Sequence, residues 1–200
     1  DFAYLSSVAR GQLALVADKD APFDDLESMV NYAKANGPLA VALNASPPKL
    51  LLGAVSRETG AEFQFVNTKG GAESMKLLMG GQVMAAFAGG SHGPYIESGD
   101  MKMIAVGNAQ RHAYAPDVKT IAEQGYGVSL DSTFYIATTK GTDPAIIEGL
   151  SNAISNALAS DEVIEVVRNA AKSSVLDLDP KATHSLMLDG LPVMKKLIGK

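Results

Sequence analysis

Short apolar runs alternate with helical stretches through the middle of the chain, and only a few polar residues separate them. The apolar runs predict strands at residues 39–43, 63–66, 83–87 and 101–106. The stretches between them predict helices at residues 49–59, 72–79 and 94–98. Strands and helices that alternate over short links are typical of a parallel sheet covered on both faces by helices. The pattern therefore predicts an α/β fold with a mostly parallel sheet flanked by helices.

Ligands of such sheets bind at the carboxyl ends of the strands, and three loops lie there: residues 44–49, 68–72 and 88–92. The second loop contains Lys69, Gly70, Gly71 and Ala72 at the start of a helix. Free backbone N–H groups and the helix dipole favour an anion at such a start. A tight turn with a solvated lysine explains the same residues equally well. If the loop binds an anion, the expected donors are the N–H groups of Gly70, Gly71 and Ala72, with Lys69 adding charge.

The first and third loops supply further candidates for binding a carboxylate. These are Asn44, Ala45, Ser46, Lys49, Gly90 and Ser91. Asn44 and Ser46 precede a helix, where such residues are more often caps than ligand contacts. His92 beside the third loop is expected to be structural or exposed.

The overall composition narrows the classes of function. The chain has 200 residues, of which 46% are hydrophobic and 20% charged, so it can form a substantial core. A net charge of −5 gives no general attraction for nucleic acid or anionic membranes. The absence of cysteine excludes a disulfide framework, a thiolate zinc site and a cysteine nucleophile. No apolar stretch in the sequence approaches the roughly 20 residues that span a bilayer.

Charged residues elsewhere have simpler explanations than catalysis. Arg111 can bind a carboxylate through two N–H groups, but an ion pair with a nearby acid that holds its loop is the favoured interpretation. Asp161 and Glu162 fall in the first turn of a predicted helix, where the dipole stabilises them. The sequence contains no dinucleotide fingerprint, P-loop, zinc-protease motif or serine-hydrolase elbow. We therefore expect no catalytic residues, no metal and no cofactor.

Several motifs, in their order along the chain, resemble the tripartite tricarboxylate transporter substrate-binding proteins, also called the Bug family. The matching segments are 26–36, 69–72, 78–83, 96–99, 103–106, 116–118, 120–126 and 140–142, together with Arg111. No single motif is specific for the family, whereas the ordered set is fairly specific and spans nearly the whole chain.

The resemblance implies a two-lobed fold of the type II periplasmic binding protein class. It implies that residues 1–22 belong to a partial first lobe, that 23–127 form a complete second lobe of βα units, and that 128–200 return to the first lobe with C-terminal helices. In the family, the loop that matches residues 44–49 is usually rich in Gly and Ser. Here Pro47 and Pro48 remove two N–H donors and Lys49 adds a cation.

The function implied by the resemblance is a periplasmic solute-binding protein, not an enzyme. It would hold a small carboxylate and deliver it to membrane transporter subunits after lobe closure. Two alternatives remain open: the effector-binding domain of a LysR-type transcription regulator, and an α/β enzyme with a dispersed site. A partial lobe is expected to expose a sheet edge and apolar surface, which favours a dimer of the fragment.

Overall fold

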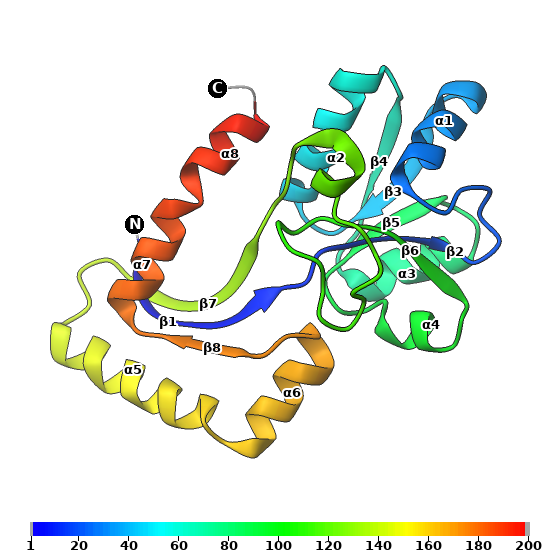
Figure 1. Ribbon diagram of the computed structural model, residues 1–200. Helices are drawn as coiled ribbons and strands as arrows, with labels where there is room; N and C mark the ends of the chain where they lie inside the picture. Colours follow the sequence, from blue (N-terminus) through cyan, green and yellow to red (C-terminus); the bar gives the residue numbers. More distant parts are fainter. Residues whose placement is uncertain (1, 199–200) are drawn as a thin grey trace. The chain divides into compact units, whose positions relative to one another are not determined.

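The computed structural model describes residues 2–198 and divides the chain into two compact units (Figure 1). Unit 1 consists of residues 1–11 and 132–194, and unit 2 consists of residues 12–131 and 195–200. The chain therefore leaves one unit for the other after Gly11, Asp131 and Met194. Strand β2, which follows Gly11, belongs to the sheet of unit 2. The lobe boundaries expected from the resemblance, after residues 22 and 127, stay a prediction.

Unit 2 is built on a five-stranded sheet in the order β4-β3-β5-β2-β6. Its strands are β2 (Ala14–Asp18), β3 (Leu39–Leu43), β4 (Phe63–Asn67), β5 (Ala85–Ala88) and β6 (Met101–Val106). Strand β3 pairs in parallel with β4 and β5, whereas β2 is antiparallel to both β5 and β6. Four strands therefore share one direction, and β2 is inserted among them in the opposite direction.

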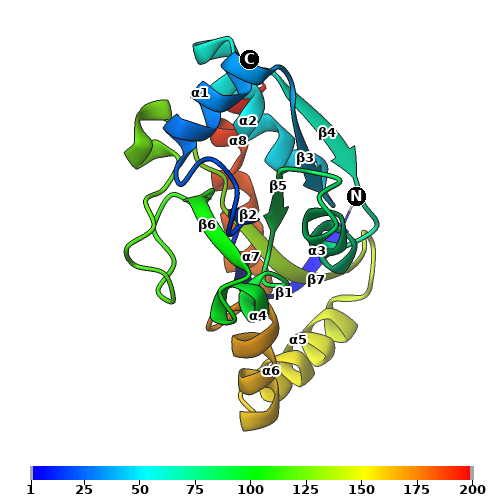
Figure 2. The ribbon, with the colours of Figure 1, turned by 90° about the vertical axis from the view of Figure 1, so that its right-hand side faces the viewer.

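Helices cover both faces of this sheet. They are α1 (Leu26–Asn36), α2 (Ser46–Thr59), α3 (Gly71–Met79) and α4 (Gly93–Glu97), followed by the irregular turn η1 (Ala122–Tyr126). On one face Met75 and Leu78 of α3 pack with Val16 and Ala42, and Figure 2 shows α3 beside β3 and β5. Residues of a strand alternate between the two faces, so Val41, which precedes Ala42 in β3, points to the other face. Helix α2 contacts β3 and β4 on that face.

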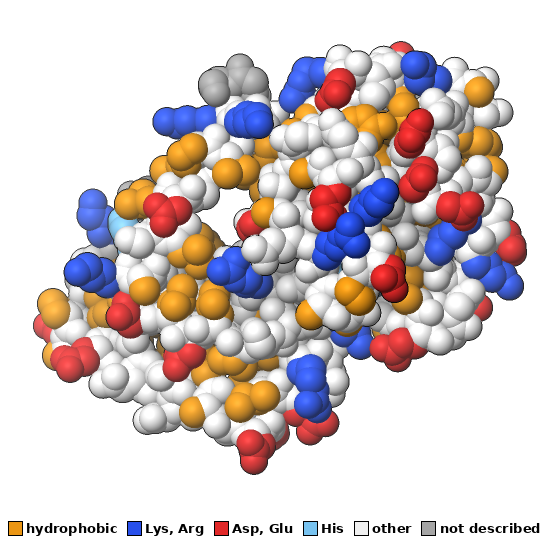
Figure 3. Space-filling model, viewed as in Figure 1, with side chains coloured by type: hydrophobic (Ala, Val, Ile, Leu, Met, Phe, Trp, Pro, Cys, Tyr) orange, Lys and Arg blue, Asp and Glu red, His pale blue; other side chains and the backbone are white. Residues whose placement is uncertain are grey.

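Unit 1 contains an antiparallel sheet in the order β7-β1-β8. Its elements are β1 (Phe2–Gly11), β7 (Ser132–Thr139), β8 (Val175–Leu178), α5 (Pro144–Leu158), α6 (Asp161–Ala171), α7 (Pro180–Asp189) and α8 (Leu191–Leu197), in which the chain crosses to unit 2. The edge strand β7 exposes Phe134, Tyr135 and Ile136 to 51%, 44% and 39%. Hydrophobic side chains are visible at the surface over this unit in Figure 3. Within residues 2–198, no helix has both the length and the apolar character needed to cross a membrane.

Candidate functional site

The three predicted loops meet at one edge of the unit 2 sheet, because β4, β3 and β5 are parallel neighbours. Strand β2 begins at the same edge, since Ala14 pairs with Ala88 at the end of β5 and with Val106 at the end of β6. We call this the carboxyl edge. It comprises residues 12–13, 44–49, 68–72, 88–92 and 107–114.

The connections of the sheet reverse direction at the carboxyl edge. After β3 the chain passes through α2 to β4, on one side of β3. After β5 it passes through α4 to β6, on the other side. Strands β3 and β5 are neighbours whose outgoing connections run in opposite directions across the sheet. Open α/β sheets bind ligands at such a point.

The start of α3 presents backbone donors at this edge. Gly70 is the N-cap and no side chain caps the helix. The N–H groups of Gly71 and Ala72 belong to the first turn, where a helix offers no internal acceptor. The N–H of Lys69 donates to the carboxylate of Glu73 at 2.6 Å, so that amide is already occupied, and the Lys69 side chain is exposed.

Gly71 and Ser91 bring two of the predicted loops into contact. A Cβ added at Gly71 would collide with the side chain of Ser91, at only 2.9 Å from its Cβ. A Cβ at Gly70 would meet no atom within 4 Å, and the φ of Gly70 is 179°, which any residue adopts. The Oγ of Ser91 is buried and has no hydrogen-bond partner among residues 2–198. Of these two adjacent glycines, Gly71 is thus the one that the packing requires.

The start of α2 differs from the sequence expectation in two respects. The helix begins at Ser46 rather than Lys49, and its N-cap is Ala45, which makes no side-chain capping bond. The expectation that Asn44 or Ser46 caps this helix is therefore wrong. Both residues are exposed. The ammonium of Lys49 lies 5.2 Å from the centre of the Phe65 ring, a cation–π contact with β4. Pro47 in the first turn leaves fewer N–H donors here than at α3.

Four helix starts elsewhere are closed by their own side chains. Asp25 caps α1, Asp143 caps α5, Ser160 caps α6 and Asp179 caps α7, each accepting a backbone N–H bond. Helices α2 and α3, which begin at the carboxyl edge together with the five-residue helix α4, have no such cap. A helix start without a cap leaves N–H donors for an external acceptor. The carboxyl edge therefore combines two open helix starts.

A cluster of three rings, two buried histidines and the more exposed Tyr114, completes this edge and was not predicted from the sequence. His92 and His112 are 0% and 1% exposed. The hydroxyl of Tyr114 lies 2.7 Å from His92 Nε2 and 2.9 Å from His112 Nδ1. Burial lowers the pKa of His112 to about 4 and raises the pKa of Tyr114. Nothing in their spacing indicates the contact, because the two loops meet only in the folded sheet.

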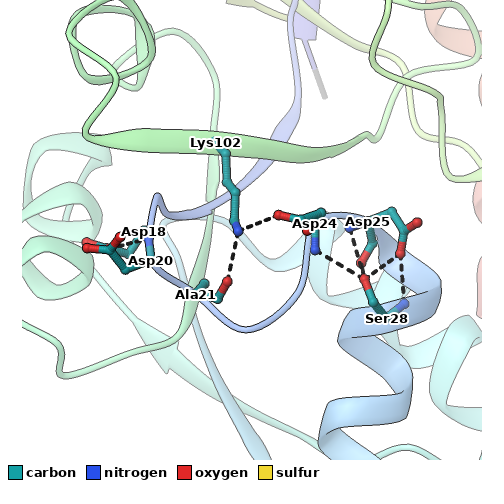
Figure 4. Close-up of polar contacts among 7 residues, drawn as sticks. All are labelled: Asp18, Asp20, Ala21, Asp24, Asp25, Ser28 and Lys102. Carbon is teal, nitrogen blue, oxygen red and sulfur yellow. Dashed lines mark hydrogen bonds and ion pairs between the residues drawn. The ribbon is translucent and has the colours of Figure 1, made fainter.

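The opposite edge of the same sheet, residues 18–28 and 100–102, is closed by internal contacts (Figure 4). Lys102 Nζ contacts the carbonyl of Ala21 at 2.8 Å and the carboxylate of Asp24 at 2.6 Å. The N–H of Ser28 donates to Asp25 at 2.8 Å, and hydrogen bonds from Ser28 lower the pKa of that carboxyl.

A cavity of about 650 Å³ beside this opposite edge is unsuited to an anion. It is lined by the acidic residues Asp24, Asp25, Glu27, Asp117 and Glu123, together with Lys119 and apolar groups. Arg111 does not supply a free cation here, because its Nε lies 2.9 Å from Glu123 Oε2 in an ion pair. This agrees with the ion pair favoured from the sequence. Within residues 2–198, no three His, Asp or Glu side chains are grouped as metal ligands.

Solved periplasmic binding proteins share this fold. The periplasmic binding protein BugD matches with a TM-score of 0.86 at 22% identity, covering 99% of this chain and 68% of BugD. MatC from Rhodopseudomonas palustris, solved with bound malate, matches with a TM-score of 0.86 at 20% identity, covering 98% of this chain and 69% of MatC. The fold is that of a periplasmic binding protein, as the sequence predicted.

The sequence comparisons identify the family. Residues 1–200 match the family model described as tripartite tricarboxylate transporter family receptor. Protein BugT of Bordetella pertussis is 31% identical over 197 residues, 94% of this chain and 59% of BugT. The chain belongs to the tripartite tricarboxylate transporter receptor family, which confirms the resemblance found in its motifs. It spans 49% to 59% of the length of the first curated relatives that it matches.

Proposed function

We propose that this chain binds a small carboxylate at the carboxyl edge of unit 2 and acts within a periplasmic receptor of a tripartite tricarboxylate-type transporter. The observation that carries the proposal is the pair of open helix starts at α2 and α3, whereas α1, α5, α6 and α7 are capped by side chains. Backbone N–H groups at a helix start bind anions through hydrogen bonds and the dipole. MatC, which shares the fold, was solved with malate, and that supports the same chemistry here.

The proposed ligand contacts follow from the geometry of the two starts. At α3 the N–H groups of Gly70, Gly71 and Ala72 bind one carboxylate, with Lys69 as an exposed cation nearby. Residues of the other two loops bind the rest of the ligand through side chains and backbone. These are Asn44, Ala45, Ser46, Lys49, Gly90 and Ser91. Local donors must supply the affinity, because the net charge of −5 opposes an anion.

Binding without catalysis is the interpretation that the family supports. Backbone amides hold an anion but supply no nucleophile and no general base. The receptor family also favours a periplasmic binding protein over the effector domain of a LysR-type regulator. We therefore infer a periplasmic location, membrane transporter subunits as partners and no role for nucleic acid.

A dimer of this 200-residue chain remains part of the proposal. Strand β7 lies at an edge of its sheet, contains no charged residue, and exposes Phe134, Tyr135 and Ile136. Uncharged apolar edge strands pair with strands of other chains. Light scattering on the purified chain tests this: a dimer mass is expected, and a monomer at all concentrations contradicts it.

Isothermal titration with a panel of acids tests the binding itself. The panel contains malate, succinate, adipate, citrate, glutamate and benzoate, with malamide as an uncharged control of malate's shape. We expect at least one di- or tricarboxylate to bind and malamide to give no heat. A folded chain, judged by circular dichroism, that binds none of these acids would contradict the proposed function.

A further inference from the structure

A continuous row of side-chain hydrogen bonds runs along the carboxyl edge. It begins at His92 in the third loop and passes through Tyr114 and His112 at 2.7 and 2.9 Å. His112 Nε2 then lies 2.8 Å from Asn108 Oδ1, and Asn108 Nδ2 donates to Asp131 Oδ1 at 3.0 Å. His92 and Asp131 are thereby joined through three residues of the segment 108–114. We call this row the His92–Asp131 network.

One backbone group sets the orientation of Asn108. The N–H of Leu13 donates to Asn108 Oδ1 at 2.7 Å, and a backbone N–H is always a donor. The amide oxygen of Asn108 must therefore face Leu13, and its NH₂ group must face Asp131. Asp131 Oδ1 also accepts the N–H of Ala109 at 3.2 Å, so this carboxylate oxygen is the acceptor at this end.

The proton positions of both histidines follow from that orientation. Asn108 Oδ1 is an acceptor, so His112 Nε2 must carry the proton it shares with it. Burial lowers the pKa of His112 to about 4, so the ring is neutral at pH 7 and its Nδ1 accepts. Tyr114 then donates its O–H to His112 Nδ1, and its oxygen accepts from His92 Nε2–H. Every donor in the network points from His92 toward Asp131.

The two ends of the network have different roles in the fold. His92 follows Gly90 and Ser91, which are candidate ligand contacts. Leu13 and Asp131 lie at or near two of the points where the chain passes from one unit to the other, after Gly11 and after Asp131. Backbone bonds hold the same region: the N–H of Gly107 donates to Leu13 O and the N–H of Leu130 to Gly107 O, both at 2.8 Å. The network thus connects a ligand loop to two chain crossings.

We propose that Tyr114, His112 and Asn108 are positioning residues that tie the loop 89–92 to Leu13 and Asp131, so that a carboxylate held by the loop changes the conformation at both crossings. The proposal rests on the proposed function, because it takes the loop as part of the carboxylate site. It adds a route by which binding in unit 2 affects the segments that lead into unit 1.

Nitrogen NMR of the histidine rings tests the network without any ligand. His112 is expected as the Nε2–H tautomer at pH 7, and His92 is expected to carry a proton on Nε2. An Nδ1–H tautomer of His112 would overturn the proton order derived above and with it the network. These measurements use the wild-type chain.

The variant Tyr114→Phe tests transmission, because it removes the shared hydroxyl and keeps the ring. We expect amide shift changes at residues 89–92 and also at Leu13 and Asp131. Tyr32→Phe is the matched control. Tyr32 lies in α1, packs against Phe23 and makes no contact with the network. Changes confined to the immediate neighbours of Tyr114 would overturn the proposal. If Tyr114→Phe does not fold, His92→Gln breaks the network at its other end and the same shifts are expected.

Malate titration separates this inference from the proposed function. In the wild-type chain we expect malate to shift the amides of residues 89–92 and those of Leu13 and Asp131. In Tyr114→Phe the remote shifts are expected to vanish while malate still binds, about three- to tenfold more weakly, as loss of a hydrogen bond allows. Remote shifts that persist in the variant overturn the positioning role. Binding of no acid by the wild-type chain overturns the proposed function, and the ligand-free experiments still decide the tether.

Discussion

The two edges of the unit 2 sheet are made of the same strands but differ in whether side chains cap the helices that begin there. At the opposite edge, α1 begins with the Asp25 cap, and the N–H of Leu26 donates to Gln124 at 2.8 Å. At the carboxyl edge, α2 and α3 begin without side-chain caps, and the buried Oγ of Ser91 has no partner among residues 2–198. At the opposite edge, side chains of the protein accept N–H groups at the start of α1. At the carboxyl edge, the N–H groups at the starts of α2 and α3 have no capping side chain and can bind an external acceptor.

This difference teaches where stability and function are separated in the molecule. Internal caps stabilise a helix by about 1 kcal/mol, so omitting them costs stability unless another acceptor takes their place. Changes at the carboxyl edge should therefore alter ligand affinity more than folding, and changes at the opposite edge should do the reverse. The following predictions test this division.

The largest effect is expected for Gly71→Ala, because the new Cβ collides with Ser91. Overpacking of this kind typically lowers the free energy of unfolding by about 1–3 kcal/mol. Because the collision lies at the proposed site, we expect malate affinity to fall by about tenfold or more in calorimetry. Gly70→Ala is the matched control, since its Cβ meets no atom within 4 Å, and it should bind normally. Ser91→Gly added to Gly71→Ala should restore packing. Equal losses for both glycines would refute the contact.

Acid should destabilise the carboxyl edge through His112. The pKa of His112 is lowered from 6.5 to about 4, so between these values the unfolded chain binds a proton that the folded chain does not. Stability therefore falls as the pH drops from about 6.5 to 4, by about 1–3 kcal/mol, since one pKa unit corresponds to about 1.4 kcal/mol. Urea unfolding at pH 7 and pH 4.5 measures it. His112→Gln should reduce the loss, His184→Gln in unit 1 should not, and equal pH dependence in all three chains would contradict this origin.

Loss of the cap at the opposite edge should affect folding alone. Asp25→Ala removes the acceptor of the Ser28 N–H, which should cost about 1 kcal/mol in urea unfolding at pH 7. The contribution depends on the ionised carboxylate, whose pKa is lowered, so it is present at neutral pH and lost as the pH falls through that folded-state pKa. Asp24→Ala is the control and should cost less, because its ion pair with Lys102 is exposed. A change in malate affinity for Asp25→Ala would break the division between the edges.

The smallest effect is expected for Glu73→Gln at the start of α3. The Glu73 carboxylate accepts the Lys69 N–H and places a negative charge where the ligand is proposed to bind. Removing this charge should tighten malate binding about two- to fivefold, with under about 1 kcal/mol lost from folding, since exposed charge–dipole terms are of that size. Glu27→Gln, in the first turn of α1, is the matched control and should leave affinity unchanged. Weaker binding by Glu73→Gln would show that this carboxylate organises the site.

Much of unit 2 was predictable because its signals are local. Apolar runs predicted β3 to β6 close to their observed bounds. Strand β1 was missed because it buries Ser6 and Ser7 and contains register shifts that break the apolar alternation. Its partners lie far along the chain: Ser7 Oγ donates to Thr183 Oγ1 at 3.1 Å across 176 residues.

The candidate site was predictable at the level of loops but not of contacts. Parallel strands dictate that loops 44–49, 68–72 and 88–92 share an edge, and the structure places them there. Their roles as ligand contacts stay a prediction. The cation–π contact of Lys49, the collision behind Gly71 and the shared hydroxyl of Tyr114 each need two loops in register, which no local pattern encodes.

The amide of Leu13 gives the His92–Asp131 network a property that ordinary mutation cannot remove. Side chains at 92, 112 and 114 can be exchanged, but the main-chain hydrogen at position 13 disappears only if proline is placed there. Whatever stands at position 108 must offer that hydrogen an oxygen, as Asn108 does. A main-chain N–H thus sets the donor-to-acceptor direction of the hydrogen bonds through four side chains. Substitutions elsewhere in the network do not reverse that direction.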